Sequence, residues 1–190
     1  MKRVFIVHGW EGYPEEGWFP WLKGELEKQN YNVSVPSMPN PSSPAILPWV
    51  EHLDKTIGKP DENTYLIGHS IGCQTILHYL DTISGSANVG GVIFVAGFVK
   101  LQNLKTDEEK KLAKKWLDSP INWGKIKFLS KRFVAIFSDN DSWVPLSNSN
   151  FFKEKLDAKI VIESKKGHFS GSDGIKKLPV ILEELLKISK

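Results

Sequence analysis

One stretch of the chain decides the fold, Tyr65-Leu66-Ile67-Gly68-His69-Ser70-Ile71-Gly72-Cys73. It holds Gly-x-Ser-x-Gly at the point where an apolar run gives way to a helical pattern. A serine in a tight strand-to-helix turn has strained backbone angles, and a glycine two residues to either side removes the Cβ clashes of that turn. The turn lifts the Ser70 hydroxyl above the sheet and points the N–H of Ile71 toward a developing oxyanion. The stretch therefore predicts Ser70 as a catalytic nucleophile.

Phosphate-binding turns are excluded by the residues around these glycines. A P-loop needs Gly-Lys-Ser or Gly-Lys-Thr, and the chain has neither after a strand-like run. A dinucleotide-binding turn needs Gly-x-Gly-x-x-Gly, which the chain also lacks. The alternative to a nucleophile turn is thus an ordinary glycine-rich loop between a strand and a helix.

Short β-rich apolar runs alternate with segments of helical period along the chain. The expected strands are Val4–Val7, Asn32–Val35, Thr64–Ile67, Val92–Ala96, Phe133–Phe137 and Lys159–Ile162. The expected helices are Trp18–Gln29, Ile46–Ile57, Ile71–Ile83, Thr106–Leu117, Asn148–Leu156 and Ile175–Ile188. Nearly continuous Val, Ile and Phe is typical of strands buried on both faces of a parallel sheet. We expect one α/β domain over residues 1–190, a three-layer α/β/α sandwich with about six mostly parallel strands.

A histidine is needed as the base, because a serine hydroxyl is a poor nucleophile at neutral pH. Of the five histidines, His52 and His78 lie in helical patterns, and His69 precedes the serine and should leave the turn in another direction. His8 closes the first strand and is expected to brace its loop. His168 lies after the last expected strand, at the edge where ligands bind in open α/β sheets. We predict His168 as the base.

The acid of the site is expected in the segment after the fifth strand, where Asp139 and Asp141 compete. One carboxylate should face Nδ1 of the base, and the other can shape the turn through its own backbone contacts. Spacing alone leaves both residues open. The order serine, aspartate, histidine along the chain is that of α/β-hydrolases.

The remaining site predictions concern the mouth of the site. The N–H of Trp10, in the loop after the first strand, is expected to be the second oxyanion donor beside that of Ile71. The segment 98–130 departs longest from the alternating pattern, and we expect it to pass over the strand ends as a lid or cap. Aromatic side chains near this mouth either pack in the core or line a substrate pocket. The predicted pocket residues are Phe98, Trp116, Trp123 and Trp143.

Composition excludes several other classes of protein. The 190 residues are 41% hydrophobic with seven Trp, which excludes disorder, and no apolar run approaches the length of a membrane span. The net charge of +3 comes from lysines mixed with acids, so we expect no nucleic-acid partner. Histidines and cysteine lack metal-ligand spacing, and we expect neither a metal nor another cofactor. One cysteine and no signal-peptide pattern indicate a reduced, cytoplasmic protein.

The chain resembles the α/β-hydrolases over almost its whole length. It is most similar to the small single-domain serine hydrolases that include the retinoblastoma-binding hydrolase and its bacterial relatives. The resemblance rests on Val7-His8-Gly9-Trp10, Trp18-Phe19-Pro20-Trp21-Leu22, Met38-Pro39-Asn40-Pro41, Gly68-His69-Ser70-Ile71-Gly72-Cys73, Ser138-Asp139-Asn140-Asp141-Ser142-Trp143-Val144-Pro145 and Gly167-His168-Phe169. It implies a trimmed fold that lacks the first strands of larger relatives. It also aligns Asp141 as the acid, with Ser138 where the family often has glycine.

These residues predict a serine hydrolase that cleaves an ester-like bond through an acyl-enzyme. Its substrate would be a small-molecule ester with an apolar acyl or alcohol part, whereas nothing in the sequence signals a peptide-binding groove. The alternative is a weak or inactive member of the fold that binds a protein or a small ligand. An intact set of serine, histidine and aspartate favours the enzyme. The sequence identifies no protein partner.

Overall fold

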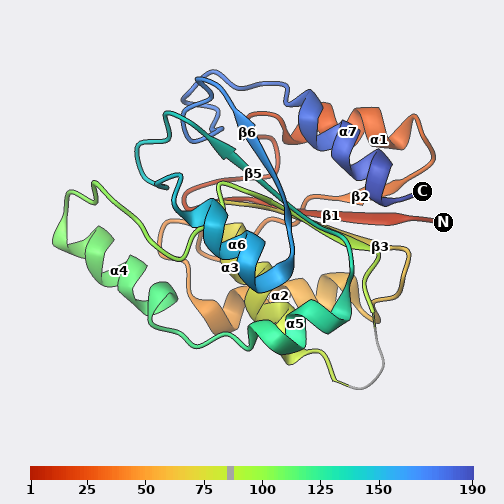
Figure 1. Cartoon of the computed structure of the whole chain (residues 1–190), viewed down its shortest axis with the longest axis horizontal. Coiled ribbons are helices and arrows are strands. Elements are labelled where there is room, and N and C mark those ends of the chain that lie inside the picture. The colour runs from red at the N-terminus through yellow and green to blue at the C-terminus, as the bar shows by residue number, and fades with distance from the viewer. Residues whose placement is uncertain (85–87) are drawn as a thin grey trace.

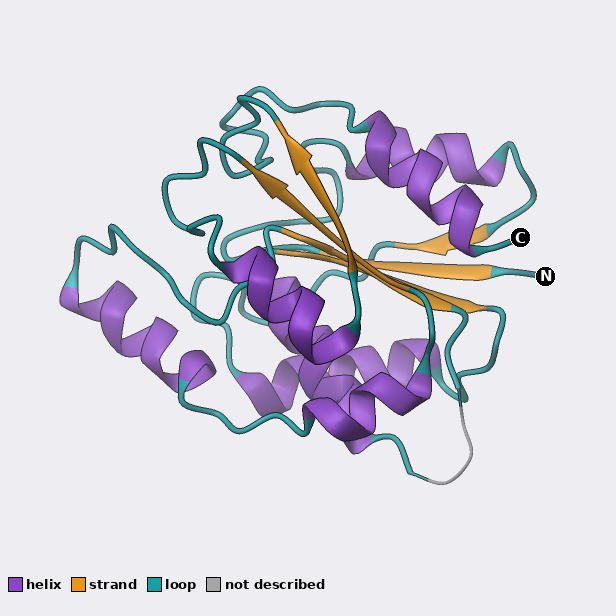
Figure 2. Ribbon diagram, viewed as in Figure 1, coloured by secondary structure: helices purple, strands orange, loops and turns teal. Residues whose placement is uncertain are grey.

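The computed structural model describes residues 1–84 and 88–190 and is built on one sheet of six strands, all parallel (Figure 2). The strands are β1 (Arg3–Val7), β2 (Asn32–Ser34), β3 (Thr64–His69), β4 (Gly91–Val95), β5 (Phe133–Ser138) and β6 (Lys159–Glu163). Every residue of β3, β4 and β5 is buried, as their continuous apolar sequences predict, whereas the edge strand β6 is partly exposed. The predicted α/β sandwich with about six mainly parallel strands is confirmed.

Helices cover both faces of the sheet (Figure 1). They are α1 (Phe19–Glu27), α2 (Ile46–Ile57), α3 (Ile71–Thr82), α4 (Asp107–Leu117), α5 (Trp123–Leu129), α6 (Asn148–Leu156) and α7 (Pro179–Ile188). Helices α1 and α7 pack side by side on one face, and α2, α3, α5 and α6 cover the other. Helix α4 lies apart from these layers, beyond one end of the sheet (Figure 1).

Two helices differ from the sequence expectation. Helix α5 was not predicted; it begins after Asn122, whose side chain caps the N–H of Lys125, and it buries Ile126. Helix α7 begins at Pro179 instead of Ile175, because proline is well suited to the first turn of a helix and poorly suited to its interior. Both departures depend on residues at the start of the helix, a capping Asn122 and a first-turn Pro179, which apolar periodicity does not reveal.

The strand order β2-β1-β3-β4-β5-β6 places a topological switch point between β1 and β3. From β1 the chain crosses to β2 on one side, and then returns to β3 on the other side of β1. The loops after β1 and β3 therefore diverge and leave a crevice at the carboxyl ends of these strands. Ligands bind at this position in open α/β sheets. The loop with Trp10 follows β1, and Ser70 follows β3.

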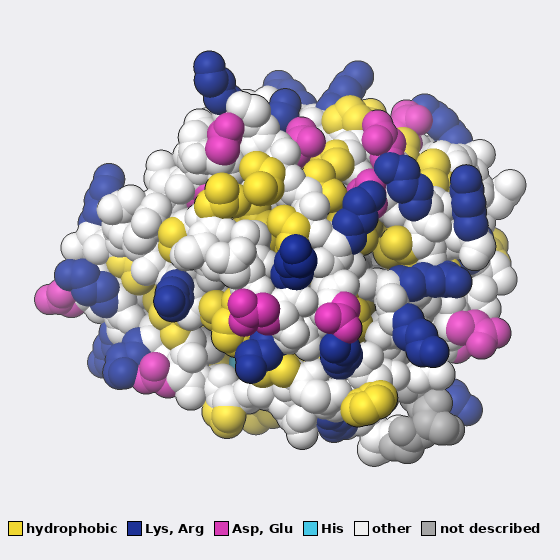
Figure 3. Space-filling model, in the orientation of Figure 1, with side chains coloured by type: hydrophobic (Ala, Val, Ile, Leu, Met, Phe, Trp, Pro, Cys, Tyr) yellow, Lys and Arg dark blue, Asp and Glu magenta, His cyan; other side chains and the backbone are white. Residues whose placement is uncertain are grey.

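Charged side chains of both signs are interspersed over the face of the molecule shown in Figure 3, without a single-sign stripe on that face. Within residues 1–84 and 88–190, no helix is both long enough and apolar enough to cross a membrane.

Candidate active site

The turn between β3 and α3 holds Ser70 in a rarely populated backbone conformation, with φ 53° and ψ −121°. Two hydrogen bonds fix this residue: its N–H donates to the carbonyl of Val95 at 2.9 Å, and its carbonyl accepts from the N–H of Cys73 at 2.9 Å. A non-glycine residue at such angles costs of order 1–3 kcal/mol, which the surrounding structure must offset. The turn has the backbone geometry of a nucleophile elbow.

Close packing explains both glycines of the motif. A Cβ atom at Gly68 would lie 2.7 Å from the backbone nitrogen of Cys73, and one at Gly72 would lie 2.2 Å from the carbonyl oxygen of Val7. Both neighbours are backbone atoms, which cannot move aside as a flexible side chain can. The first turn of α3 is therefore pressed directly against the backbone of β1 and of its own strand.

The loops after β5 and β6 bring Asp141 and His168 together. Nδ1 of His168 donates to Oδ2 of Asp141 at 2.8 Å. The other carboxylate oxygen, Oδ1, accepts from the N–H groups of Trp143 and Val144 at 2.8 and 2.9 Å. The side chain of Asp141 is 2% exposed and that of His168 is 11% exposed, so water competes little for their hydrogen bond. This arrangement fixes the imidazole with Nδ1 protonated and Nε2 free to accept a proton.

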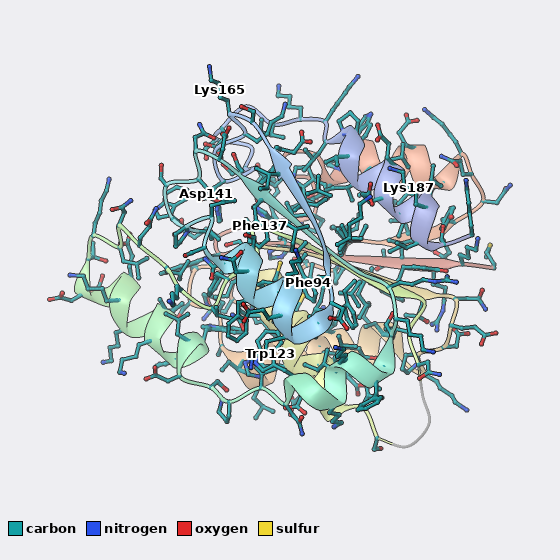
Figure 4. All side chains as sticks on the ribbon, viewed as in Figure 1. Phe94, Trp123, Phe137, Asp141, Lys165 and Lys187 are labelled. Atoms are coloured by element: carbon teal, nitrogen blue, oxygen red, sulfur yellow. The ribbon has the colours of Figure 1, made fainter. Side chains whose placement is uncertain are left out.

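Asp139, the competing carboxylate, faces away from this histidine. Its oxygens accept from the N–H of Lys165 at 2.7 Å and from the hydroxyl of Ser164 at 2.8 Å, and these bonds lower the pKa of the Asp139 carboxyl. Asn140 accepts from the N–H of Gly167 at 2.8 Å in the same manner. Asp139 and Asn140 thus tie the loop after β5 to the loop after β6 (Figure 4, where Asp141 and Lys165 lie at the same edge of the sheet).

A cavity of about 1510 Å³ opens above this edge, and both Ser70 and His168 line it. Among the described residues, no hydrogen bond joins the hydroxyl of Ser70 to an acceptor. Catalytic hydrogen bonds are often long in the absence of substrate and tighten when it binds. The described residues contain no cluster of three or more His, Cys, Asp or Glu side chains able to hold a metal.

Trp10 and Ile71 also line the cavity. Within the part of the chain that the structure describes, the N–H of neither residue donates to a protein acceptor, so both donors are free for a ligand. The loop that carries Trp10 is braced by His8, whose Nδ1 donates to the carbonyl of Gly9 at 2.9 Å and whose Nε2 accepts from Met38 at 3.1 Å. Burial lowers the pKa of His8, which keeps it neutral in this role.

Of the four aromatic residues predicted to line the pocket, Phe98, Trp116 and Trp143 do line the cavity. Trp116 links α4 to the loop before α2, because its indole donates a hydrogen bond to the carbonyl of Pro44 at 3.2 Å. Trp143 meets the ring of His168 edge-on, with 5.2 Å between centroids. The segment 98–130 thus supplies one wall of the cavity through α4, and its motion as a lid stays a prediction.

Trp123 requires a correction, because it lies outside this cavity. It packs against the rings of Phe151 and Phe152 beside α5 and α6, and it borders a separate cavity of about 250 Å³. Figure 4 shows it well apart from Asp141. Its place on an unpredicted helix explains the error, since α5 turns the tryptophan toward α6.

Comparison with solved structures defines the class of fold. The crystal structure of the ydeN gene product of Bacillus subtilis superposes with a TM-score of 0.88 at 31% identity, covering 99% of this chain and 98% of that one. A carboxylesterase structure from Nitrososphaera gargenis superposes with a TM-score of 0.72 at 14% identity, covering 99% and 90% of the two chains. The protein has the fold of the α/β-hydrolases.

Sequence comparison is more specific. The family model described as serine hydrolase matches residues 4–187. YdeN of Bacillus subtilis (strain 168) is 32% identical over 185 residues, which are 97% of this chain and 94% of YdeN. The serine hydrolase RBBP9 of Rattus norvegicus is 25% identical over 158 residues, 83% of this chain and 80% of RBBP9. The chain belongs to the serine hydrolase family.

The close packing at Gly72 gives a first prediction. Gly72→Ala should lower the free energy of unfolding by about 3 kcal/mol or more, because the new methyl group overlaps the backbone of β1. Urea unfolding followed by circular dichroism measures the change. Gly24→Ala is the control: the site lies within α1 with no atom within 4 Å of the added Cβ. That variant should gain about 0.5–1 kcal/mol, and an equal effect of both changes would contradict the packing argument.

The buried histidine next to the serine gives a second prediction. Burial, and after it the charge of His168, lowers the pKa of His69 from 6.5 to about 3. The hydrogen bond to the His168 carbonyl opposes this shift, as do the charges of Asp141 and Asp173. The unfolded chain takes up this proton as the pH falls through 6.5 and the folded chain does not. The stabilising contribution of His69 is therefore complete above pH 6.5 and is lost as the pH falls toward 3.

We expect His69→Gln to remove this proton uptake. Between about pH 7 and pH 5, the variant should lose about 2 kcal/mol less of its free energy of unfolding than the wild type does. Urea unfolding at the two pH values measures the difference. Equal losses in the two proteins would mean that His69 is not held neutral.

Proposed function

We propose that this serine hydrolase cleaves carboxylic esters through a catalytic triad of Ser70, His168 and Asp141. The observation that carries the proposal is the buried 2.8 Å hydrogen bond between Asp141 and His168 at the mouth of a cavity that Ser70 enters from a nucleophile elbow. A carboxylate that orients an imidazole beside an exposed serine is the arrangement that activates a hydroxyl at neutral pH. The proposal needs no group beyond those of the chain and water.

The reaction has two halves. In the first, His168 Nε2 takes the proton of Ser70 as its oxygen attacks the ester carbonyl, and the same proton then passes to the departing alkoxide. The alcohol leaves and the acyl group stays on the serine as an ester. In the second, a water molecule attacks this ester, His168 takes the proton of the water and returns it to the serine oxygen, and the carboxylic acid leaves.

Charge in both halves is balanced by fixed groups. The carboxylate of Asp141 stabilises the imidazolium of His168, and the free N–H groups of Ile71 and Trp10 are proposed as donors to the oxyanion. Removal of one such donor costs about 10²–10³ in kcat in enzymes of this mechanism. The helix α3 adds positive potential, because its N-terminus begins at Ile71 beside the reacting carbonyl.

The cavity lining supports an ester with a bulky apolar part. Trp143 is 41% exposed and presents aromatic surface to the cavity that Ser70 lines, and the partly buried Leu101 and Leu112 add aliphatic surface. Phe98 and Trp116 border the same cavity as buried side chains. Such surface binds acyl chains or aromatic alcohols through burial and offers few hydrogen bonds to the polar groups of a peptide backbone.

Labelling with a fluorophosphonate probe tests the nucleophile. The wild type should react covalently with the probe, and Ser70→Ala should lose the label because the attacking oxygen is gone. Gel fluorescence measures the labelling, with Ser149→Ala, a substitution outside the cavity, as the matched control. A label that survives in Ser70→Ala would refute the assignment. No label in the wild type, joined with no turnover of short p-nitrophenyl esters, would favour a ligand-binding role on the same fold.

The two aspartates after β5 are distinguished by a second pair of variants. Asp141→Asn should lower kcat by about 10⁴-fold, since the amide cannot hold the imidazole in the required tautomer or stabilise its charge. Asp139→Asn should change kcat by less than about tenfold, because an amide oxygen still accepts from Lys165. Turnover of a p-nitrophenyl ester measures both rates. Equal losses in the two variants would remove Asp141 from its proposed role.

A further inference from the structure

His69 is a buried histidine that the mechanism above does not use. It ends β3 directly before Ser70, and its imidazole is enclosed by the rings of Trp18 and Phe19, with centroids 6.2 and 6.1 Å away. Its Nε2 lies 2.7 Å from the main-chain carbonyl oxygen of His168. One hydrogen bond therefore joins the neighbour of the proposed nucleophile to the residue that carries the proposed base.

The direction of this bond is set by chemistry. A carbonyl oxygen only accepts, so Nε2 of His69 carries the proton and donates it. Burial holds the imidazole neutral, with a pKa of about 3. A neutral imidazole has one N–H proton, which here is on Nε2. Nδ1 is accordingly a bare acceptor, and among the described residues no group donates to it. Within the described residues, the one hydrogen bond of the ring is therefore the one to the His168 carbonyl.

The backbone of His168 is held on both sides of its Cα atom. Its N–H donates to Oδ2 of Asp173 at 2.9 Å, and its carbonyl accepts from His69. The next carbonyl, of Phe169, accepts from the indole of Trp18 at 3.1 Å. Phe169 itself has a positive φ of 60°, a conformation that a bulky side chain adopts only under constraint. The histidine loop is thus strained and needs these contacts to keep its shape.

We infer that His69 is a positioning residue, whose hydrogen bond to the His168 carbonyl sets the distance between the Ser70 hydroxyl and the His168 imidazole. The inference rests on the proposed triad. Asp141 fixes the rotation of the imidazole, but it cannot fix where the ring stands relative to β3, because Asp141 belongs to the loop after β5. His69 belongs to β3 itself, so its hydrogen bond fixes the backbone of His168 relative to the strand that leads into Ser70.

The expected effect of losing this bond is on the chemical step. A displacement of about 1 Å between reacting groups can lower a rate by about 10²-fold while substrate binding is unchanged. His69→Leu removes the donor and keeps an apolar side chain in the pocket. We expect it to lower kcat by about 10–10²-fold and to leave KM within about twofold.

Two amide variants separate the hydrogen bond from general packing. Gln carries its N–H the same number of bonds from Cβ as Nε2 of histidine, whereas Asn is one bond shorter. His69→Gln should therefore keep kcat within about threefold of the wild type, and His69→Asn should fall with His69→Leu. His78→Leu controls for loss of a buried imidazole, because His78 is buried on α3 outside the cavity and its Nε2 also lacks a partner in the described chain.

The measurements are kcat and KM for a p-nitrophenyl ester and hydrogen exchange of residues 166–171, which requires no turnover. We expect faster exchange of this segment in His69→Leu and His69→Asn and near wild-type exchange in His69→Gln. Wild-type kcat in His69→Leu, equal kcat in the Gln and Asn variants, or unchanged exchange in all three would overturn the inference. If His69→Leu fails to fold, the comparison of kcat and hydrogen exchange between His69→Gln and His69→Asn tests the inference instead. An inactive wild type with the expected exchange pattern would refute the proposed function. It would still support the inference that the hydrogen bond from His69 holds the His168 loop in place.

Discussion

The contact between the first turn of α3 and the backbone of β1 governs this structure. Only a glycine at position 72 allows the helix to approach so closely, because a Cβ atom there would lie 2.2 Å from the Val7 carbonyl oxygen. This approach places the start of α3 at the switch point of the sheet and forces Ser70 into its strained conformation. The strain persists because the bonds to Val95 and Cys73 over-determine the residue. The crevice, the position of the half-buried Ser70 at the cavity and the free N–H of Ile71 all follow from it.

Around this rigid turn, the other groups of the site are carried on loops that are fixed mainly by side chains bonded to backbone. Asp141 binds two N–H groups of its own loop, Asp139 and Asn140 bind the loop after β6, and Asp173 and His69 bind the main chain of His168. Such bonds set position without adding apolar contacts, so two exposed loops acquire a fixed geometry at the edge of a parallel sheet. Trp143 takes part in both the cavity and this loop geometry, since it lines the cavity and its N–H donates to Asp141.

Strand positions and the nucleophile turn could be predicted from sequence, because buried parallel strands read as continuous apolar runs and the turn requires glycines at fixed spacing. Asp139 and Asp141 could not be separated by spacing, since both follow β5 and only the facing loop decides which one meets His168. The hydrogen bond of His69 to the His168 loop and the place of Trp123 against α6 could not be predicted either. A side chain's direction in a loop or on a short helix depends on distant segments, such as Trp18 beside His69 or Phe151 beside Trp123.

The parallel order of the strands has a consequence for how activity arises during folding. The groups of the site come from the loops after β1, β3, β5 and β6, and β6 is both the last strand in sequence and an edge of the sheet. Contacts between segments so distant in sequence form late and slowly. A nascent or partly refolded chain can therefore contain most of its helices, and even its central strands, before the loop with His168 reaches Ser70. Catalysis in such a molecule reports completion of the whole sheet, whereas helical content does not.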